Sequence, residues 1–113
     1  MGLMVPGKSG MTLLWKNEGV STFVPQKVEI ALAAYDYVAV DFAARYNQQP
    51  HWVVMCAVGD MNRTPGYMAH SSGASGWDRQ FSVDETGVTF EAGYTGSQDN
   101  TASVPMKIYG IKI

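Results

Sequence analysis

The chain has 113 residues, enough to bury the core of one domain but not of two. Charged residues make up 16% of it, the net charge is −2, and the eight lysines and arginines are scattered rather than clustered. Binding to phosphate groups needs clustered cations, so we expect neither nucleic acid nor an anionic membrane surface as a partner. No apolar run reaches the roughly 18 residues of a membrane-spanning helix, so no membrane insertion is expected.

Glycine and proline interrupt the chain roughly every 10–15 residues, a spacing that predicts many short strands rather than helices. We expect an all-β fold, an antiparallel β-sandwich of jelly-roll type. Its strands, about eight in number, are predicted at residues 11–16, 26–32, 35–45, 51–58, 66–70, 77–83, 87–94 and 103–113. Residues 1–10 are expected to be disordered or a connecting stub, and residues 11–113 to form the single domain.

Three of these segments alternate apolar and polar residues, as a strand with one buried face does. The residues expected to face the core are Val28, Ile30, Leu32, Phe81, Val83, Val88, Phe90, Ala92 and Tyr94. Residues 46–50, between two apolar strands, have the composition of a turn. Pro105 predicts an edge position or a bulge near the start of the last strand.

The strands at 35–45 and 51–58 carry apolar residues on nearly both faces. Such strands are central in a sheet, or another subunit covers one of their faces. We therefore expect the domain to self-associate. The single cysteine, Cys56, lies in the second of these strands and cannot form an internal disulfide. It is expected to be a buried, inert side chain, because a catalytic thiol needs a basic partner and no sequence neighbour supplies one.

Several short segments stand in a recognisable order between residues 12 and 113: 12–17 (TLLWKN), 35–40 (YDYVAV), 79–83 (RQFSV), 87–90 (GVTF), Gly93-Tyr94 and 105–112 (PMKIYGIK). With this order, and above all with the ending KIYGIK, the chain resembles the C-terminal head domains of bacteriophage tail-fibre and minor structural proteins. The resemblance implies a β-sandwich head, often a homotrimer, that is presented to the host surface. It implies no catalytic residues.

Several patterns that could carry chemistry lack the context they need. Residues 2–9 match the phosphate-loop pattern and include Lys8, but no strand precedes them and a strand is predicted after them. His51, His70 and Cys56 are too far apart in sequence for a typical zinc site, so neither a metal nor a cofactor is expected. Weaker alternatives are a glycosidase pair from the acidic pairs Asp36/Asp41 or Asp84/Glu85, and calcium at the loop 97–100.

The stretch from residue 59 to 79 mixes aromatic rings with amide, carboxylate and guanidinium groups around glycines. Sugar binding needs a flat apolar surface for the sugar's C–H groups and fixed polar groups for its hydroxyls. The candidate ligand-binding residues are therefore Asn62, Arg63, Tyr67, His70, Trp77, Asp78 and Arg79. Tyr67 and Trp77 have the alternative of packing on neighbouring strands, and Arg79 that of a structural ion pair with a carboxylate.

Together these observations predict a non-enzymatic head domain of a virion appendage that binds a host-surface receptor, a glycan or other polymer. Its expected partners are that receptor, other copies of itself as a homotrimer, and the rest of a fibre polypeptide. The alternative is a purely structural module that caps or trimerises a fibre, or decorates a capsid, without binding a receptor. An enzyme that degrades the host polymer is the third reading.

Overall fold

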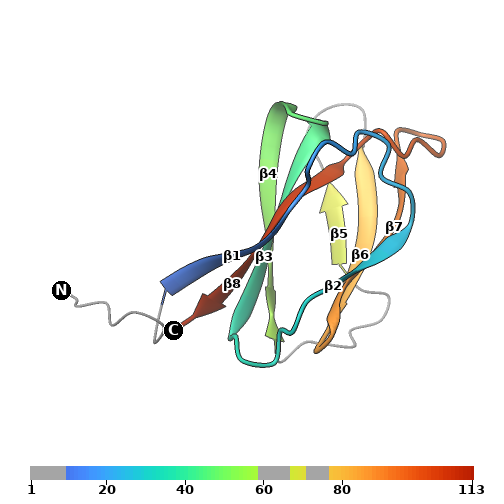
Figure 1. The fold of residues 1–113 in the computed structure, drawn as a ribbon. Helices are drawn as coiled ribbons and strands as arrows, with labels where there is room; N and C mark the ends of the chain where they lie inside the picture. The colour runs from blue at the N-terminus through green and yellow to red at the C-terminus, as the bar shows by residue number, and fades with distance from the viewer. Residues whose placement is uncertain (1–9, 59–66, 71–76) are drawn as a thin grey trace.

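In the computed structural model, which describes residues 10–58 and 77–113 and the main chain of 67–70, eight antiparallel strands form two sheets. The first sheet has the order β1-β8-β3-β4, with bounds Gly10–Lys16, Val104–Lys112, Tyr37–Arg45 and Gln48–Ala57. The second has the order β2-β7-β6-β5, with bounds Gln26–Glu29, Gly87–Tyr94, Asp78–Asp84 and Tyr67–His70. The sheets pack face to face (Figure 1), which confirms the predicted all-β sandwich.

The pairing of the strands defines the topology of the sandwich. The first strand pairs with the last and β2 pairs with β7, the nested arrangement expected of a jelly roll. Inside this frame, β3 and β4 form one hairpin, while β5, β6 and β7 run as a meander in the other sheet. The last strand, β8, lies between β1 and β3 in the middle of its sheet.

The core lies between the two sheets and is filled by the alternating side chains that the sequence predicted. Val28, Leu32, Phe81, Val83, Val88 and Phe90 are buried, and Ile30 packs partly buried beside them. Phe42 of β3 meets Phe81 of β6 at 5.5 Å between ring centroids, so aromatic contacts join the two sheets directly. Cys56 is buried, as expected.

Tyr94 was expected to face the core, and that prediction is wrong, because its side chain is 43% exposed. Arg79 pairs with Gly93 and Phe81 with Phe90, so a single residue of β6, Gln80, stands opposite two residues of β7, Glu91 and Ala92. A bulge of this kind reverses the alternation beyond it. It therefore turns Tyr94 outward, beside its partner Asp78.

The turn predicted over residues 46–50 is shorter than expected. Only Tyr46 and Asn47 form it, since Arg45 already pairs with Gln48. Asn47 has φ +57°, a left-handed conformation that asparagine tolerates better than most residues. Residues 48–50 therefore belong to β4, which is ten residues long.

The bulge predicted at Pro105 is present. Asp41 pairs with Lys107 and Phe42 with Pro105, so Met106 is the extra residue in β8. A proline is compatible with a strand between two neighbours at such a bulge, because the ladder is already interrupted there.

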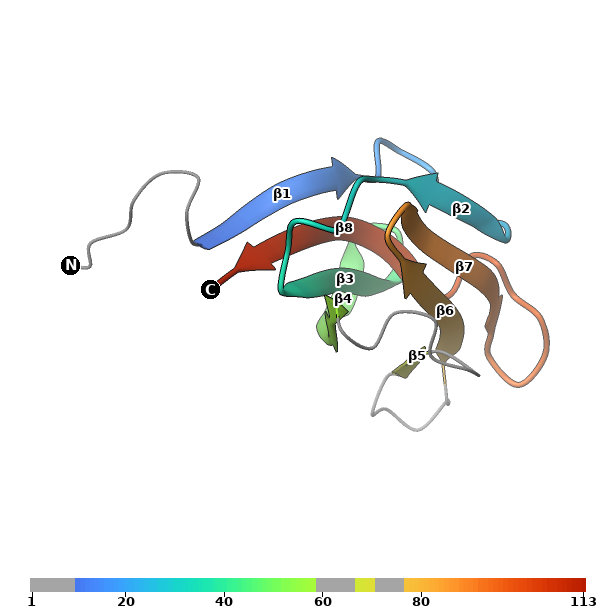
Figure 2. The same cartoon turned by 90° about the horizontal axis from the view of Figure 1, so that it is seen from below.

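The sandwich has two ends of different character. At one end β1 begins and β8 ends, since Gly10 pairs with Lys112. At the other end β3 turns into β4, and the segment after β7 leads into β8; Figure 2 shows β1 and β8 running side by side between these ends. We call the second of these the far end of the domain.

Candidate functional site

A hollow of about 410 Å³ lies on the outer face of the second sheet, which we call the β6–β7 hollow. Its walls come from β6, from β7 and from the residue just before β2. They are Pro25, Asp78, Gln80, Phe81, Ser82, Glu91, Ala92 and Tyr94.

The strand pattern of β6 explains why polar groups line this hollow. Asp78, Gln80 and Ser82 are half-exposed, and they alternate with the buried residues Arg79, Phe81 and Val83. Since side chains alternate between the two faces of a strand, the three polar residues lie on the outer face. The bulge in β7 then brings Tyr94 to the same face, opposite Asp78.

The hollow therefore combines an exposed aromatic ring with carboxylate, amide and hydroxyl groups. Among the described residues in its walls, Asp78 and Glu91 are the charged ones, and both are acidic. The ring of Tyr94 has an apolar surface, while the side chains of Gln80 and Ser82 each contain a donor and an acceptor group. Such a surface suits a ligand with many hydroxyl groups and no negative charge.

Arg79, a candidate ligand-binding residue, is instead fully buried beneath this face. Its five N–H groups all donate to main-chain carbonyl oxygens, so it has no donor left for a ligand. The acceptors, at 2.6–3.1 Å, are Ser103 from Nε, Phe23 and Glu91 from Nη1, and Asn100 and Ala102 from Nη2. The structural alternative therefore fits Arg79, although its bonded partners are carbonyl groups rather than a carboxylate.

Burial lowers the pKa of Arg79 to about 10, an effect that the nearby carboxylate of Asp99 partly opposes. Arg79 thus remains charged at neutral pH. Its contacts join β6 to β7, to the segment before β2 and to the segment before β8, so it fixes the strands beneath the β6–β7 hollow.

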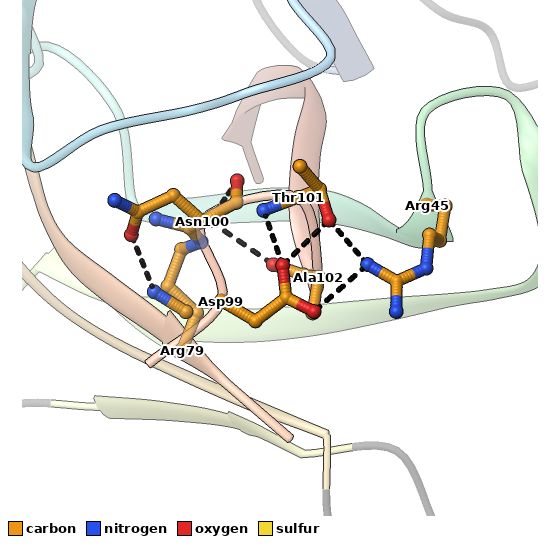
Figure 3. A network of polar contacts seen from close by, with 7 residues as sticks. Arg45, Arg79, Asp99, Asn100, Thr101 and Ala102 are labelled. Carbon is orange, nitrogen blue, oxygen red and sulfur yellow. Dashed lines mark hydrogen bonds and ion pairs between the residues drawn. The ribbon is translucent and has the colours of Figure 1, made fainter. Parts of the chain in front are cut away.

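Asp99 stands at the centre of the polar network drawn in Figure 3. Its carboxylate accepts hydrogen bonds from the main chain and hydroxyl of Thr101, and it forms an ion pair with Arg45 at 3.1 Å. The hydrogen bond from the Thr101 hydroxyl is the main reason that the pKa of Asp99 lies below its ordinary value. The loop residue considered for calcium is thus already bound to Arg45.

Trp77 belongs to this network rather than to the β6–β7 hollow. The guanidinium carbon of Arg45 lies 4.8 Å from the centre of the Trp77 ring, a cation–π contact that joins the start of β6 to the end of β3. This contact favours the alternative that Trp77 packs on a neighbouring strand.

The remaining candidate ligand-binding residues lie in different parts of the chain. Asp78 lines the hollow. Tyr67 and His70 lie in β5, where their main chains pair with Phe81 and Asp78. Asn62 and Arg63 lie outside the described residues. The sequence reasoning missed Gln80, Ser82, Glu91 and Tyr94, although the alternation of residues 78–83 already placed two of them on an outer face.

A second hollow, of about 460 Å³, lies at the far end of the domain and has a different charge. We call it the lysine hollow, because Lys16 and Lys107 are among its walls. The others are Asn17, Glu18, Gly19, Tyr46, Asn47 and Met106. Its aromatic residue, Tyr46, packs partly buried against the core and is less available to a ligand than Tyr94.

Asp36 and Asp41, one of the two acidic pairs considered for a glycosidase, each contact a different group of the protein. The carboxylate of Asp36 accepts the main-chain N–H of Ile113 at 2.7 Å, and Asp41 lies 3.5 Å from His51 Nδ1. Asp84 accepts hydrogen bonds from the hydroxyl and main chain of Thr86 in the hairpin between β6 and β7. These contacts give the carboxylates structural roles.

Within the described residues, no three histidine, cysteine, aspartate or glutamate side chains come together as metal ligands do. In the same part of the chain, no helix is long and apolar enough to cross a membrane. Lys8 and its phosphate-loop pattern lie outside the described residues, and the segment that follows them is the strand β1 instead of the helix that such a loop requires.

No family model, curated protein or solved structure matches the chain.

Proposed function

We propose that this domain is a non-enzymatic receptor-binding head of a virion appendage, such as a bacteriophage tail fibre, and that it holds a host-surface glycan in the β6–β7 hollow. The observation that carries the proposal is the exposed ring of Tyr94 beside the polar side chains of Asp78, Gln80 and Glu91. A sugar presents apolar C–H groups and a ring of hydroxyls, and this wall has a matching surface for each.

The position of the hollow also favours such a role. Asp78 and Tyr94 pair at the end of the second sheet that faces Arg45 and Asp99, the far end of the domain. A fibre segment joined at β1 or β8 would lie at the opposite end, where Gly10 pairs with Lys112 (Figure 1). The hollow would then point away from the fibre, toward a host surface.

The charge of the hollow narrows the class of glycan. Asp78 and Glu91 repel uronic acids, sialic acids and phosphorylated polymers, and among the described residues that line the hollow there is no lysine or arginine to offset this repulsion. The expected ligands are neutral sugars and amino sugars, whose hydroxyl and ammonium groups donate hydrogen bonds to carboxylates.

The two carboxylates also raise the enzyme alternative, since a glycosidase uses a pair of acidic residues. Such an enzyme needs one carboxyl group in a dry environment that keeps it protonated. Glu91 is exposed and Asp78 is half-exposed, so neither side chain lies in a dry environment. We therefore favour binding without hydrolysis.

The purely structural alternative has its own supporting observation. Met11, Leu13, Val53 and Met55 are exposed apolar residues on the first sheet, the sheet without the β6–β7 hollow. A surface of this kind is typical of contacts between protein chains. It is compatible with receptor binding by the other sheet, so both roles can belong to one domain.

The test is a glycan array followed by calorimetry on the best ligands, with wild type and Tyr94→Ala. We expect Tyr94→Ala to weaken binding at least about tenfold while thermal stability stays unchanged, because the ring is exposed. Tyr109→Ala, on the first sheet, is the matched control and should bind as wild type does. Wild-type binding that Tyr94→Ala leaves intact would contradict the proposal.

Two further measurements distinguish this proposal from a binding site in the lysine hollow and from a hydrolase. Binding of anionic glycans that is lost in Lys16→Ala and Lys107→Ala would move the site to the lysine hollow. Release of new reducing ends on incubation, abolished by Glu91→Gln, would establish a hydrolase. If no glycan and no host cell binds, the structural alternative stands.

A further inference from the structure

The four edge strands of the sandwich are unequal, and β4 is the longest of them. The strands β2 and β5 have four residues each, β1 has seven and β4 has ten. In the described part of the chain, β4 pairs with β3 alone. Long edge strands offer unpaired N–H and C=O groups to other strands, and proteins usually protect them with charged residues.

Charged residues are absent from β4, and its proline and its bulge both lie before residue 51. Its sequence, QQPHWVVMCA, contains no lysine, arginine, aspartate or glutamate, whereas β1 and β2 each contain at least one charged residue. Val53 and Met55 are 58% and 56% exposed. An edge without charges can pair with a second copy of itself without bringing like charges together.

One hydrogen bond fixes which main-chain groups of β4 are available. The N–H of Val58 donates to the carbonyl oxygen of Asp36 at 2.8 Å. Bonding in an antiparallel pair alternates along the strand, so the main chains of residues 52, 54 and 56 bond to β3. Those of residues 51, 53, 55 and 57 turn to the side away from β3, where no described strand pairs with them.

The regular part of this edge has a definite centre. A bulge interrupts the pairing with β3 at residues 49–50, between the pairs Ala43–His51 and Arg45–Gln48. The regular alternation therefore covers residues 51–57, and its midpoint is Val54. An antiparallel copy that used this whole stretch would pair His51 with Ala57 and Val53 with Met55, each twice.

We infer that two copies of this chain associate through antiparallel pairing of β4 with β4, about a two-fold axis at Val54. The pairing joins the two first sheets into one sheet of eight strands, whose order across the axis is β1-β8-β3-β4 followed by the same order reversed. Val53 of one copy then packs against Met55 of the other. The inference is independent of the ligand in the β6–β7 hollow.

The area of the β4–β4 interface indicates how stable the dimer should be. Seven residues with a rise of about 3.4 Å give an edge about 24 Å long, and two sheets with their side chains are about 20 Å deep. The contact then buries about 500 Å² per copy, or about 1,000 Å² in total, the lower limit for a specific interface. We expect a dimer that dissociates on dilution.

The first test is the mass in solution, measured by sedimentation over a range of concentrations. We expect an equilibrium between 12.3 kDa and about twice that mass. The double variant Val53→Lys/Met55→Lys should be monomeric, because pairing would place lysine opposite lysine. Met11→Lys/Leu13→Lys makes the same charge change on β1, the opposite edge of the sheet, and should still dimerise. A circular dichroism spectrum checks that each variant is folded.

The second test reads the register by disulfide formation in a Cys56→Ser background. In the inferred pairing the two Val54 residues form a non-hydrogen-bonded pair, with Cα atoms about 4.5 Å apart. Val54→Cys should therefore form a disulfide with its own copy. Val53→Cys and Met55→Cys should not, because each then faces its counterpart diagonally, about 7–8 Å away.

Each other outcome overturns the inference. A monomer at every concentration, or no cross-link at any of the three positions, excludes the β4 contact. A cross-link at residue 53 or 55 instead of 54 excludes the register. A trimer, the state expected from the family resemblance, would also exclude it, since in a three-membered ring β4 cannot pair with β4 in every subunit.

Discussion

Gly93 and Arg79 face each other across β7 and β6, and a Cβ atom on residue 93 would lie 2.8 Å from Arg79 Nη2. The same atom would lie 2.6 Å from the carbonyl oxygen of Ala102 and 2.7 Å from that of Asp99. The missing side chain at residue 93 thus provides the space in which the guanidinium group meets its carbonyl partners.

Gly93→Ala should destabilise the domain by at least about 2 kcal/mol, because the carbonyl groups around Arg79 cannot move apart without losing their hydrogen bonds. Urea denaturation measures the change. Gly96→Ala is the control, since no atom lies within 4 Å of the added Cβ and only its φ of +99° opposes the substitution. Equal losses for the two variants would contradict the packing argument.

Replacing Arg79 should be more damaging. Arg79→Lys keeps the charge but offers three donors in place of five, and we expect a loss of more than about 4 kcal/mol, near the total stability of a small domain. Thermal unfolding measures it, with Arg45→Lys as the control. Arg45 is partly exposed, so its change should stay within about 1 kcal/mol. A well-folded Arg79→Lys variant of wild-type stability would show that the carbonyl cluster needs no arginine.

Acid should destabilise the domain through Asp99 and Asp84. The hydroxyl groups of Thr101 and Thr86 hold the pKa of these two carboxyls below the ordinary value, so the native state binds fewer protons than the unfolded state. Their stabilising effect is complete above the unfolded pKa of roughly 3.9 and is lost as pH falls through the lower native pKa.

The measurement is the melting temperature as a function of pH. It should be flat above about pH 5 and fall below about pH 4. The double variant Asp99→Asn/Asp84→Asn should show a shallower fall, because neither residue can take up a proton. A fall as steep as in wild type would assign the acid sensitivity to other groups.

The thiol of Cys56 should react slowly in the native protein. It is buried on the core side of β4, so a thiol reagent reaches it only when the strand opens. A colorimetric reagent should label it over the timescale of unfolding, and at once in denaturant. Val53→Cys, on the exposed face of the same strand in a Cys56→Ser background, is the fast-reacting control when both proteins are labelled at a concentration low enough to keep them monomeric. Equally fast labelling of Cys56 would mean that β4 is open in the native state.

The sequence was informative wherever two-residue alternation continued without interruption. Phe81 and Val83 were expected to face inward from their spacing, and the same spacing extended back to Arg79 indicates an inward arginine. An inward arginine predicts a structural role, since a buried charge needs partners. This signal was available, but the residue's place in a polar, aromatic stretch suggested ligand binding instead.

Tyr94 and the hairpin after β3 were beyond such reasoning. Nothing in the residues around Glu91 marks the bulge that reverses Tyr94, because a bulge depends on how two strands meet and not on one strand alone. The two-residue turn at Tyr46–Asn47 was hidden by Gln48, Gln49 and Pro50, whose composition suits a loop. The polar walls of the β6–β7 hollow need both strands, so their assembly could not be predicted from either.

The central position of β8 has a consequence for the order in which this protein can fold during synthesis. Both β1 and β3 pair with β8, and β1 has no other partner among the described strands. Lys16 ends β1 and Val104 begins β8, so a ribosome working at about 5–20 residues per second needs about 4–18 s to make the chain between them. Throughout that interval β1 has no strand to pair with, and its apolar side chains remain unpacked. The first sheet can form completely only after β8 has been synthesised.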